Sequence, residues 1–94
     1  RRVLMLKPSP TSQCVENLSE MMEYKLSLNR HKGDREGWLS CSIFDLLHLL
    51  TKEKLELYDA IHENVEPRLV REEAADIANC AMMIADVYTE TYKK

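Results

Sequence analysis

Acidic side chains occupy positions where the spacing of a helix calls for apolar ones. Over residues 43–61 apolar side chains recur every three or four residues, and Glu53 fills the gap between Leu50 and Leu57. Glu56 borders the same face one turn further along. We therefore expect both carboxylates to face the interior of the protein.

A second pair follows in the last helical segment. Glu73 lies four residues after Leu69 and four before Ile77, and Asp76 lies four before Cys80. Residues at these spacings share one face of a helix. The sequence therefore predicts two more inward carboxylates.

Burying four carboxylates is costly unless positive charge neutralises them. Few lysines or arginines fall at matching inward positions, whereas one divalent cation can contact several carboxylates together. Oxygen-only ligation favours Mg²⁺ or Mn²⁺ over zinc or copper. The predicted metal ligands and catalytic residues are Glu53, Glu56, Glu73 and Asp76. Solvated helix faces or ordinary salt bridges are the alternative interpretation.

Other site chemistries fit the sequence less well. Di-iron bundles use Glu-x-x-His pairs, and this chain offers only Asp45-x-x-His48 and Asp59-x-x-His62, which lie off the face that carries Glu53. We expect these four residues at the surface or at its boundary. No motif supports a cysteine or serine nucleophile with a histidine base.

The spacing of the acids resembles a known family signature. Glu53-x-x-Glu56, sixteen further residues and Glu73-x-x-Asp76 look like the metal-binding motif of the MazG-like all-α nucleoside triphosphate pyrophosphohydrolases. The flanking text NRHKGDREGWLSCS and EEAADIANCAMMIADV also resembles small phage- and mobile-element-type members, so the likeness covers about residues 23–87. Lys52 departs from the pattern, because many members carry a further Glu there.

The resemblance implies a Mg²⁺-dependent enzyme that cleaves a nucleoside triphosphate between its α- and β-phosphates. The products would be the monophosphate and pyrophosphate, and the role would be housecleaning of the nucleotide pool. Carboxylate-held Mg²⁺ suits this chemistry, because it can bind phosphate oxygens and orient a water for in-line attack. The family also implies dimers or tetramers of a helical bundle.

A triphosphate site needs positive charge and polar groups beside the metal. The lysine and arginine candidates are predicted to contact phosphates, the tryptophan to stack on a base or plug the core, and the asparagine to bind a sugar, phosphate, metal water or another helix. The candidate substrate-binding residues are Arg30, His31, Lys32, Arg35, Trp38, Lys54 and Asn79.

Glycine and proline divide the chain into helical segments, and no strand pattern persists, so we predict an all-α fold. The expected elements are a lead-in without regular structure over residues 1–10 and a first helix over about 11–29, followed by a polar loop over 31–39 with an exposed tryptophan. A second helix is expected to begin after Ser40 or Ser42 and to run to about Asn64, and a third helix has Pro67 at or near its first position.

The third helix is apolar on every side over residues 77–87. Such a helix needs burial all round, and three helices of one short chain can hardly provide it. We expect a helical bundle of three main helices per chain, completed to a MazG-like four-helix bundle by a homodimer or a dimer of dimers. A compact monomer is the alternative.

Composition limits the remaining possibilities. The 94 residues allow a single domain over residues 1–94, and a net charge of −3 argues against a nucleic-acid partner. Three cysteines without CxxC spacing and no membrane-length apolar run predict a soluble, cytoplasmic protein without a membrane partner. The competing function is a non-catalytic helical dimer, an antitoxin-like or scaffold module.

Overall fold

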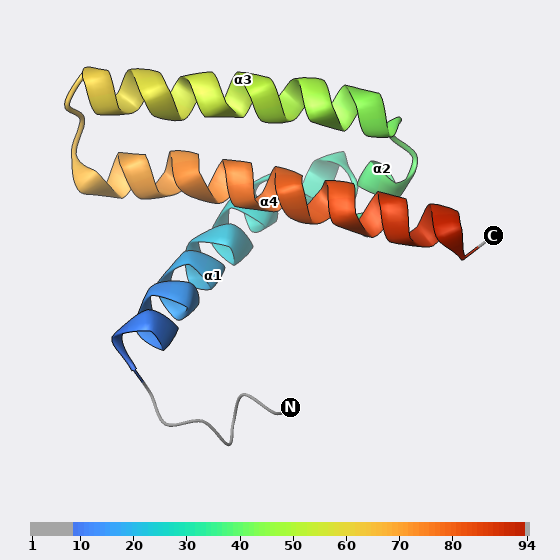
Figure 1. The fold of residues 1–94 in the computed structure, drawn as a ribbon, viewed down its shortest axis with the longest axis horizontal. Coiled ribbons are helices and arrows are strands. Elements are labelled where there is room, and N and C mark those ends of the chain that lie inside the picture. Colours follow the sequence, from blue (N-terminus) through green and yellow to red (C-terminus); the bar gives the residue numbers. More distant parts are fainter. Residues whose placement is uncertain (1–8, 94) are drawn as a thin grey trace.

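The computed structural model describes residues 9–93, which contain helices and no strands (Figure 1). This confirms the all-α prediction. The elements are α1 (Pro10–Leu28), the 3₁₀ turn η2 (Arg30–Lys32), the short α2 (Arg35–Leu39), α3 (Ile43–His62) and α4 (Pro67–Tyr92).

The hairpin of α3 and α4 is the centre of the fold. The two helices run side by side in opposite directions, and α1 crosses α4 at an angle (Figure 1). Asn64 makes the turn between them in the left-handed region, with φ of 57°, a conformation that asparagine tolerates after a helix. Because α3 and α4 are antiparallel neighbours, acids near the middle of one lie opposite acids near the start of the other.

The helix ends agree with the sequence prediction to within two residues. Ser42 caps α3 by accepting a hydrogen bond from the backbone N–H of Phe44, and Pro67 occupies the first turn of α4. Residues 1–8 of the predicted lead-in lie outside the described residues. Pro10, which we placed in that lead-in, instead begins α1, because Ser9 caps the helix and proline suits its first position.

The predicted polar loop is more ordered than expected. It contains η2 and α2, joined through Gly33, whose φ of 103° favours glycine. Trp38 was expected to be exposed, but it is half-buried against α4. The segment therefore forms a wall beside the helical hairpin.

The hydrophobic core of the single chain is small. Among the described residues the buried hydrophobic side chains are Leu46, Ala75, Cys80 and Val87. No helix in this part of the chain combines the length and the hydrophobicity needed to cross a membrane.

Candidate metal centre

Three of the four predicted carboxylates converge between α3 and α4. Glu53, Glu73 and Asp76 each place one oxygen within 4.8 Å of the other two. The antiparallel hairpin brings position 53 level with positions 73 and 76. Glu56 lies outside this group of three and pairs with Lys52 at 3.8 Å. We call Glu53, Glu73 and Asp76 the acid cluster.

The acid cluster lacks sufficient counter-charge. Burial, the neighbouring Glu56 and then Asp76 raise the pKa of Glu53 to about 7. Burial also raises the pKa of Glu73 and of Asp76. One buried oxygen of Glu53 and one of Glu73 find no hydrogen-bond partner within residues 9–93. Two of the three carboxylates therefore have a buried oxygen whose hydrogen-bonding capacity is not satisfied by the described residues.

A lysine that the sequence analysis overlooked supplies part of the neutralising charge. Lys25 on α1 places Nζ 3.4 Å from an oxygen of Asp76 and 3.6 Å from one of Glu72. Burial disfavours its charged form, but the two acids outweigh burial and raise the pKa of Lys25. The sequence analysis expected few inward cations, and Lys25 is one of those few.

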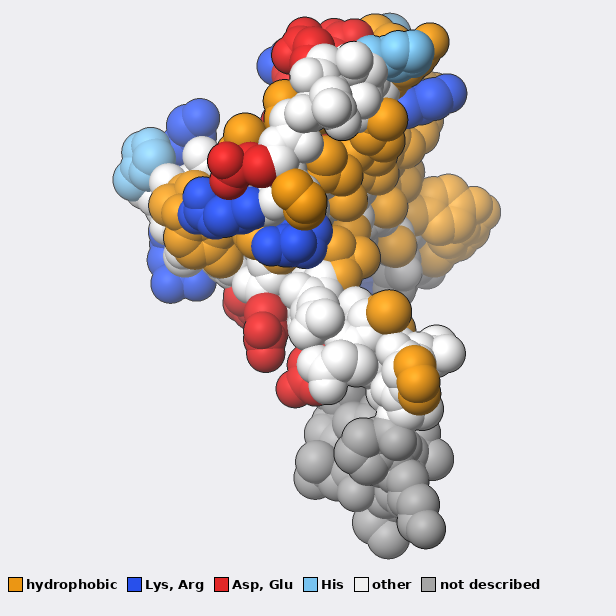
Figure 2. Space-filling model, turned by 90° about the vertical axis from the view of Figure 1, so that its left-hand side faces the viewer, with side chains coloured by type: hydrophobic (Ala, Val, Ile, Leu, Met, Phe, Trp, Pro, Cys, Tyr) orange, Lys and Arg blue, Asp and Glu red, His pale blue; other side chains and the backbone are white. Residues whose placement is uncertain are grey.

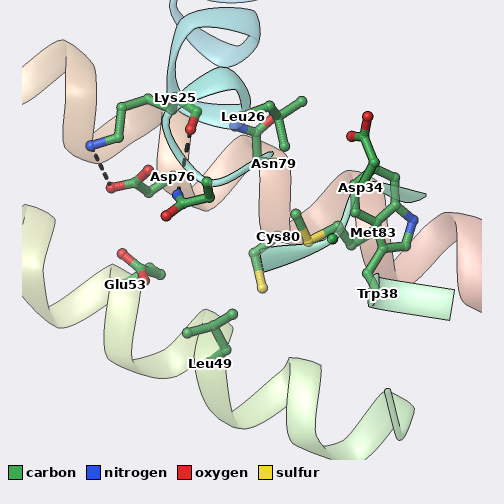
Figure 3. Close-up of a pocket in the computed structure, with 12 residues that line it drawn as sticks. Lys25, Leu26, Asp34, Trp38, Leu49, Glu53, Asp76, Asn79, Cys80 and Met83 are labelled. Carbon is green, nitrogen blue, oxygen red and sulfur yellow. Dashed lines mark hydrogen bonds and ion pairs between the residues drawn. The ribbon is translucent and has the colours of Figure 1, made fainter. Parts of the chain in front are cut away.

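A cavity of about 150 Å³ opens beside the acid cluster. Figure 3 shows Lys25, Glu53 and Asp76 at one end of it and Trp38 and Met83 at the other. The cavity therefore has a charged end and a mainly apolar end, an arrangement that suits a ligand with both an ionic and a planar apolar part.

Asn79 lines the same cavity and is 4% exposed. Its Nδ2 donates a hydrogen bond to the backbone oxygen of Met22 at 3.1 Å. Its Oδ1 is buried and has no partner among the described residues. A buried amide oxygen in this state normally has a partner, so a ligand or ordered water in the cavity would satisfy it.

Arg35 and Trp38 are held by the far end of α4. Trp38 donates from Nε1 to Asp86 at 2.8 Å, and Arg35 donates two hydrogen bonds to Asp86 at 2.9 Å and one to Glu90 at 3.0 Å. Hydrogen bonds from Arg35 and Trp38 lower the pKa of Asp86 to about 2. We call these four residues the Arg35–Asp86 cluster; it fixes the tryptophan wall of the cavity.

The remaining predicted substrate contacts lie away from the acid cluster. Arg30, His31 and Lys32 are exposed on η2, and Arg30 pairs with Asp34 at 3.7 Å. Lys54 is exposed and does not line the cavity. The structure thus brings only Trp38 and Asn79 of the seven candidates to the cavity.

The structure confirms the expected position of the two Asp-x-x-His pairs at the surface. Asp45, His48, Asp59 and His62 are all exposed, and His62 stacks edge-on against Tyr58 with ring centroids 4.3 Å apart. These residues contribute nothing to the acid cluster.

Lys25 could have been found from helical spacing, because it lies seven residues after Leu18 and three after Met22 and so continues the inward stripe of α1. Glu72 lies four residues before Asp76 and meets the same lysine. What the sequence did not reveal is that α1 crosses α4 at this point.

Comparisons with protein-family models, curated proteins and solved structures found no match to this chain.

Proposed function

We propose that this protein is a Mg²⁺-dependent nucleoside triphosphate pyrophosphohydrolase that releases pyrophosphate and a nucleoside monophosphate. The observation that carries the proposal is the acid cluster with its unpartnered oxygens beside a cavity. The likeness of its spacing to the MazG-like signature points to the same chemistry. The corresponding role is housecleaning of the nucleotide pool.

The donor set fits a hard divalent ion. Glu53, Glu73 and Asp76 offer only carboxylate oxygens, which Mg²⁺ and Mn²⁺ prefer. When bound, such an ion supplies charge stabilisation and a polarised water for attack on phosphorus. Glu56 has a carboxylate near this group and is the candidate for a further ligand or for orienting water.

The residues of the cavity divide the substrate between them. Lys25 presents its ammonium where phosphate oxygens would approach the acid cluster, while the indole of Trp38 offers an apolar surface to the base. The free Oδ1 of Asn79 accepts a hydrogen bond from a hydroxyl or amino group of the nucleoside.

A scaffold function explains the acid cluster less well. A helical interaction module has no use for raised carboxylate pKa values and free buried oxygens, which lower the stability of the fold. Lys25 offsets part of this cost but leaves one buried oxygen of Glu53 and one of Glu73 without a partner among residues 9–93. The acid cluster and its buried oxygens therefore favour the enzyme function over the scaffold function.

The direct test is a screen of ribo- and deoxynucleoside triphosphates with Mg²⁺, with detection of pyrophosphate. We expect pyrophosphate, rather than inorganic phosphate, from at least one of them. Failure to release pyrophosphate from any of them, with Mg²⁺ or Mn²⁺, would contradict the proposal.

We further propose that the protein is a homodimer or a dimer of dimers, because no described residue covers one side of the hairpin. Among the described residues only Leu46, Ala75, Cys80 and Val87 are buried hydrophobic side chains, whereas thirteen large hydrophobic side chains are exposed. Apolar surface gathered on one face is typical of a protein that buries it against a partner.

The uncovered side is apolar on both helices and lies away from α1. Figure 2 shows hydrophobic side chains gathered in a continuous patch on one side of the molecule. The residues of this open face are Phe44, Leu47, Leu55, Tyr58 and Ile61 on α3 and Val70, Ala74, Ile77, Ala81, Tyr88 and Tyr92 on α4.

A second hairpin is the partner that fits this face, because two hairpins packed together complete a four-helix bundle. Ala81 is exposed on the α4 stripe, so Ala81→Glu places a charge inside the interface and is expected to yield monomers or loss of folding. Glu16→Gln on α1 is a control away from the face. Sedimentation of the parent as a stable folded monomer at micromolar concentration would contradict the assembly.

A further inference from the structure

Lys25 is the one cation among the described residues that line the cavity. Its side chain is 18% exposed and lies between Asp76 of the acid cluster and Glu72, which is outside it. Figure 3 shows the side chain directed toward Asp76 from the opposite side to Glu53. Lys25 therefore shares a ligand carboxylate with any ion that the cluster binds.

A second feature marks this place as a ligand site independently of the acids. Asn79 lines the same cavity, and its buried amide oxygen has no partner within residues 9–93. A neutral amide does not depend on the charge balance of the cluster. Its unsatisfied oxygen indicates that something polar occupies the cavity in the functional state.

The position of Lys25 has opposite consequences for two ligands. A divalent ion about 2.1 Å from the Asp76 oxygen lies at most about 5.5 Å from the ammonium, which is 3.4 Å from that oxygen. The two positive charges repel each other, so Lys25 opposes the bare ion. A polyphosphate bound to that ion brings negative oxygens between the charges, and Lys25 then attracts it.

We propose that Lys25 couples the two ligands, so that the acid cluster binds a divalent ion weakly when alone and strongly when the ion carries a polyphosphate. Lys25 is a specificity-determining residue in this role. The inference rests on the metal site of the proposed function. Coupling of this kind is reciprocal, because each ligand raises the affinity for the other by the same factor.

The test compares two titrations of the parent and Lys25→Met, with Mn²⁺ as the probe ion and inorganic tripolyphosphate as a probe that does not depend on the base. We expect Lys25→Met to bind Mn²⁺ alone several-fold more tightly. We expect the same variant to bind the Mn²⁺–tripolyphosphate complex about tenfold more weakly. Lys25→Arg should retain the parental pattern in both titrations.

Glu72→Gln tests the same idea without removing the lysine. Lys25 pairs with both Glu72 and Asp76. When Glu72 is replaced by Gln, the ammonium pairs with Asp76 alone, and the binding of bare Mn²⁺ should weaken because that carboxylate is held more firmly by Lys25. Arg71→Met, on the exposed side of α4, removes an equal positive charge outside the cavity and is the matched control.

The outcomes separate this inference from the proposed function. If the parent binds Mn²⁺ and releases pyrophosphate, but Lys25→Met binds both probes as the parent does, Lys25 coupling alone is wrong. Equal weakening of both probes also overturns it, because a purely structural lysine gives that result. If the parent binds no Mn²⁺, with or without tripolyphosphate, the metal centre and the coupling fail together.

Discussion

Two groups of acids on α4 differ in how they are neutralised. Asp76 and Asp86 lie ten residues apart on one helix, about 15 Å along its axis. Asp86 receives hydrogen bonds from Arg35 and Trp38, and its pKa falls to about 2. Asp76 has Lys25 as its counter-ion, yet burial still raises its pKa.

The difference separates structural carboxylates from carboxylates that are available to a ligand. In the Arg35–Asp86 cluster, Arg35 and Trp38 supply the hydrogen bonds and the positive charge that the carboxylates of Asp86 and Glu90 need. The acid cluster leaves one oxygen of Glu53 and one of Glu73 without a hydrogen bond within the described part of the chain. A bound cation would neutralise the acid cluster and contact these oxygens, as Arg35 does for Asp86.

The largest effect should come from removing one charge of the acid cluster. Glu53→Gln, or Asp76→Asn, keeps the shape of the side chain but removes an anionic ligand, so turnover should fall by about 100-fold or more. Folding should survive, because an amide costs less to bury than an unpaired carboxylate. Steady-state release of pyrophosphate measures the loss.

The matched control for this change is Asp45→Asn, on the same helix but exposed and eight residues before Glu53. It should leave turnover within about twofold of the parent, because Asp45 belongs neither to the acid cluster nor to the lining of the cavity. Parental turnover in Glu53→Gln would show that the acid cluster has no catalytic role.

The two clusters differ in how well the sequence predicted them. Helical spacing correctly placed Glu53, Glu73 and Asp76 on facing sides of two helices, because a 3.6-residue period fixes the face of each residue. It did not find the pairing of Arg35 with Asp86, since these residues lie 51 positions apart. Spacing within one helix contains no information on which distant residue packs against it.

The same limit applies to Lys25 and Trp38. Their partners depend on the angle at which α1 crosses α4 and on the turn of η2 and α2, which tertiary packing decides. The helix boundaries, in contrast, followed from local signals such as the Ser42 cap and Pro67.

Addition of Mg²⁺ should stabilise only through the acid cluster. At a free concentration about 100 times its Kd, an ion that binds only the folded protein adds about 2.7 kcal/mol, or about 14 °C in melting temperature for a domain of this size. We expect the shift in the parent and in Asp86→Asn, and a much smaller shift in Glu53→Gln. EDTA should reverse the shift and abolish turnover.

Thermal unfolding in Mg²⁺ and in Ca²⁺ measures this shift in melting temperature. A sample in NaCl at the same ionic strength is the control for general screening of charges. An equal shift with NaCl alone would show that general screening, rather than a bound ion, is responsible. A shift of the same size in Glu53→Gln would place the ion elsewhere.

The Arg35–Asp86 cluster should matter for stability without depending on the ion. Arg35→Ala removes the hydrogen bonds to Asp86 and Glu90 and should lower the melting temperature by a few degrees. Arg35→Lys should lower the melting temperature less, because lysine keeps the positive charge. Some loss should remain, since lysine cannot donate two parallel hydrogen bonds to Asp86. A difference between the two variants that vanished in Mg²⁺ would contradict the independence of the clusters.

The smallest expected effect is a difference in the pH dependence of stability between the two clusters. The hydrogen bonds from Arg35 and Trp38 lower the pKa of Asp86 from its ordinary value of 3.8 to about 2. Its contribution to stability is therefore present above about pH 4 and is lost as the pH falls toward 2. The contribution of Glu53 to stability changes with pH in the opposite direction. Its pKa is about 7 against 4.5, so without metal the free energy of unfolding falls as the pH rises from about 4.5 to 7. Urea unfolding in EDTA should show the first dependence reduced in Asp86→Asn and the second reduced in Glu53→Gln. If either variant kept the full parental dependence in its own pH window, the assignment of that window to its carboxylate would be wrong.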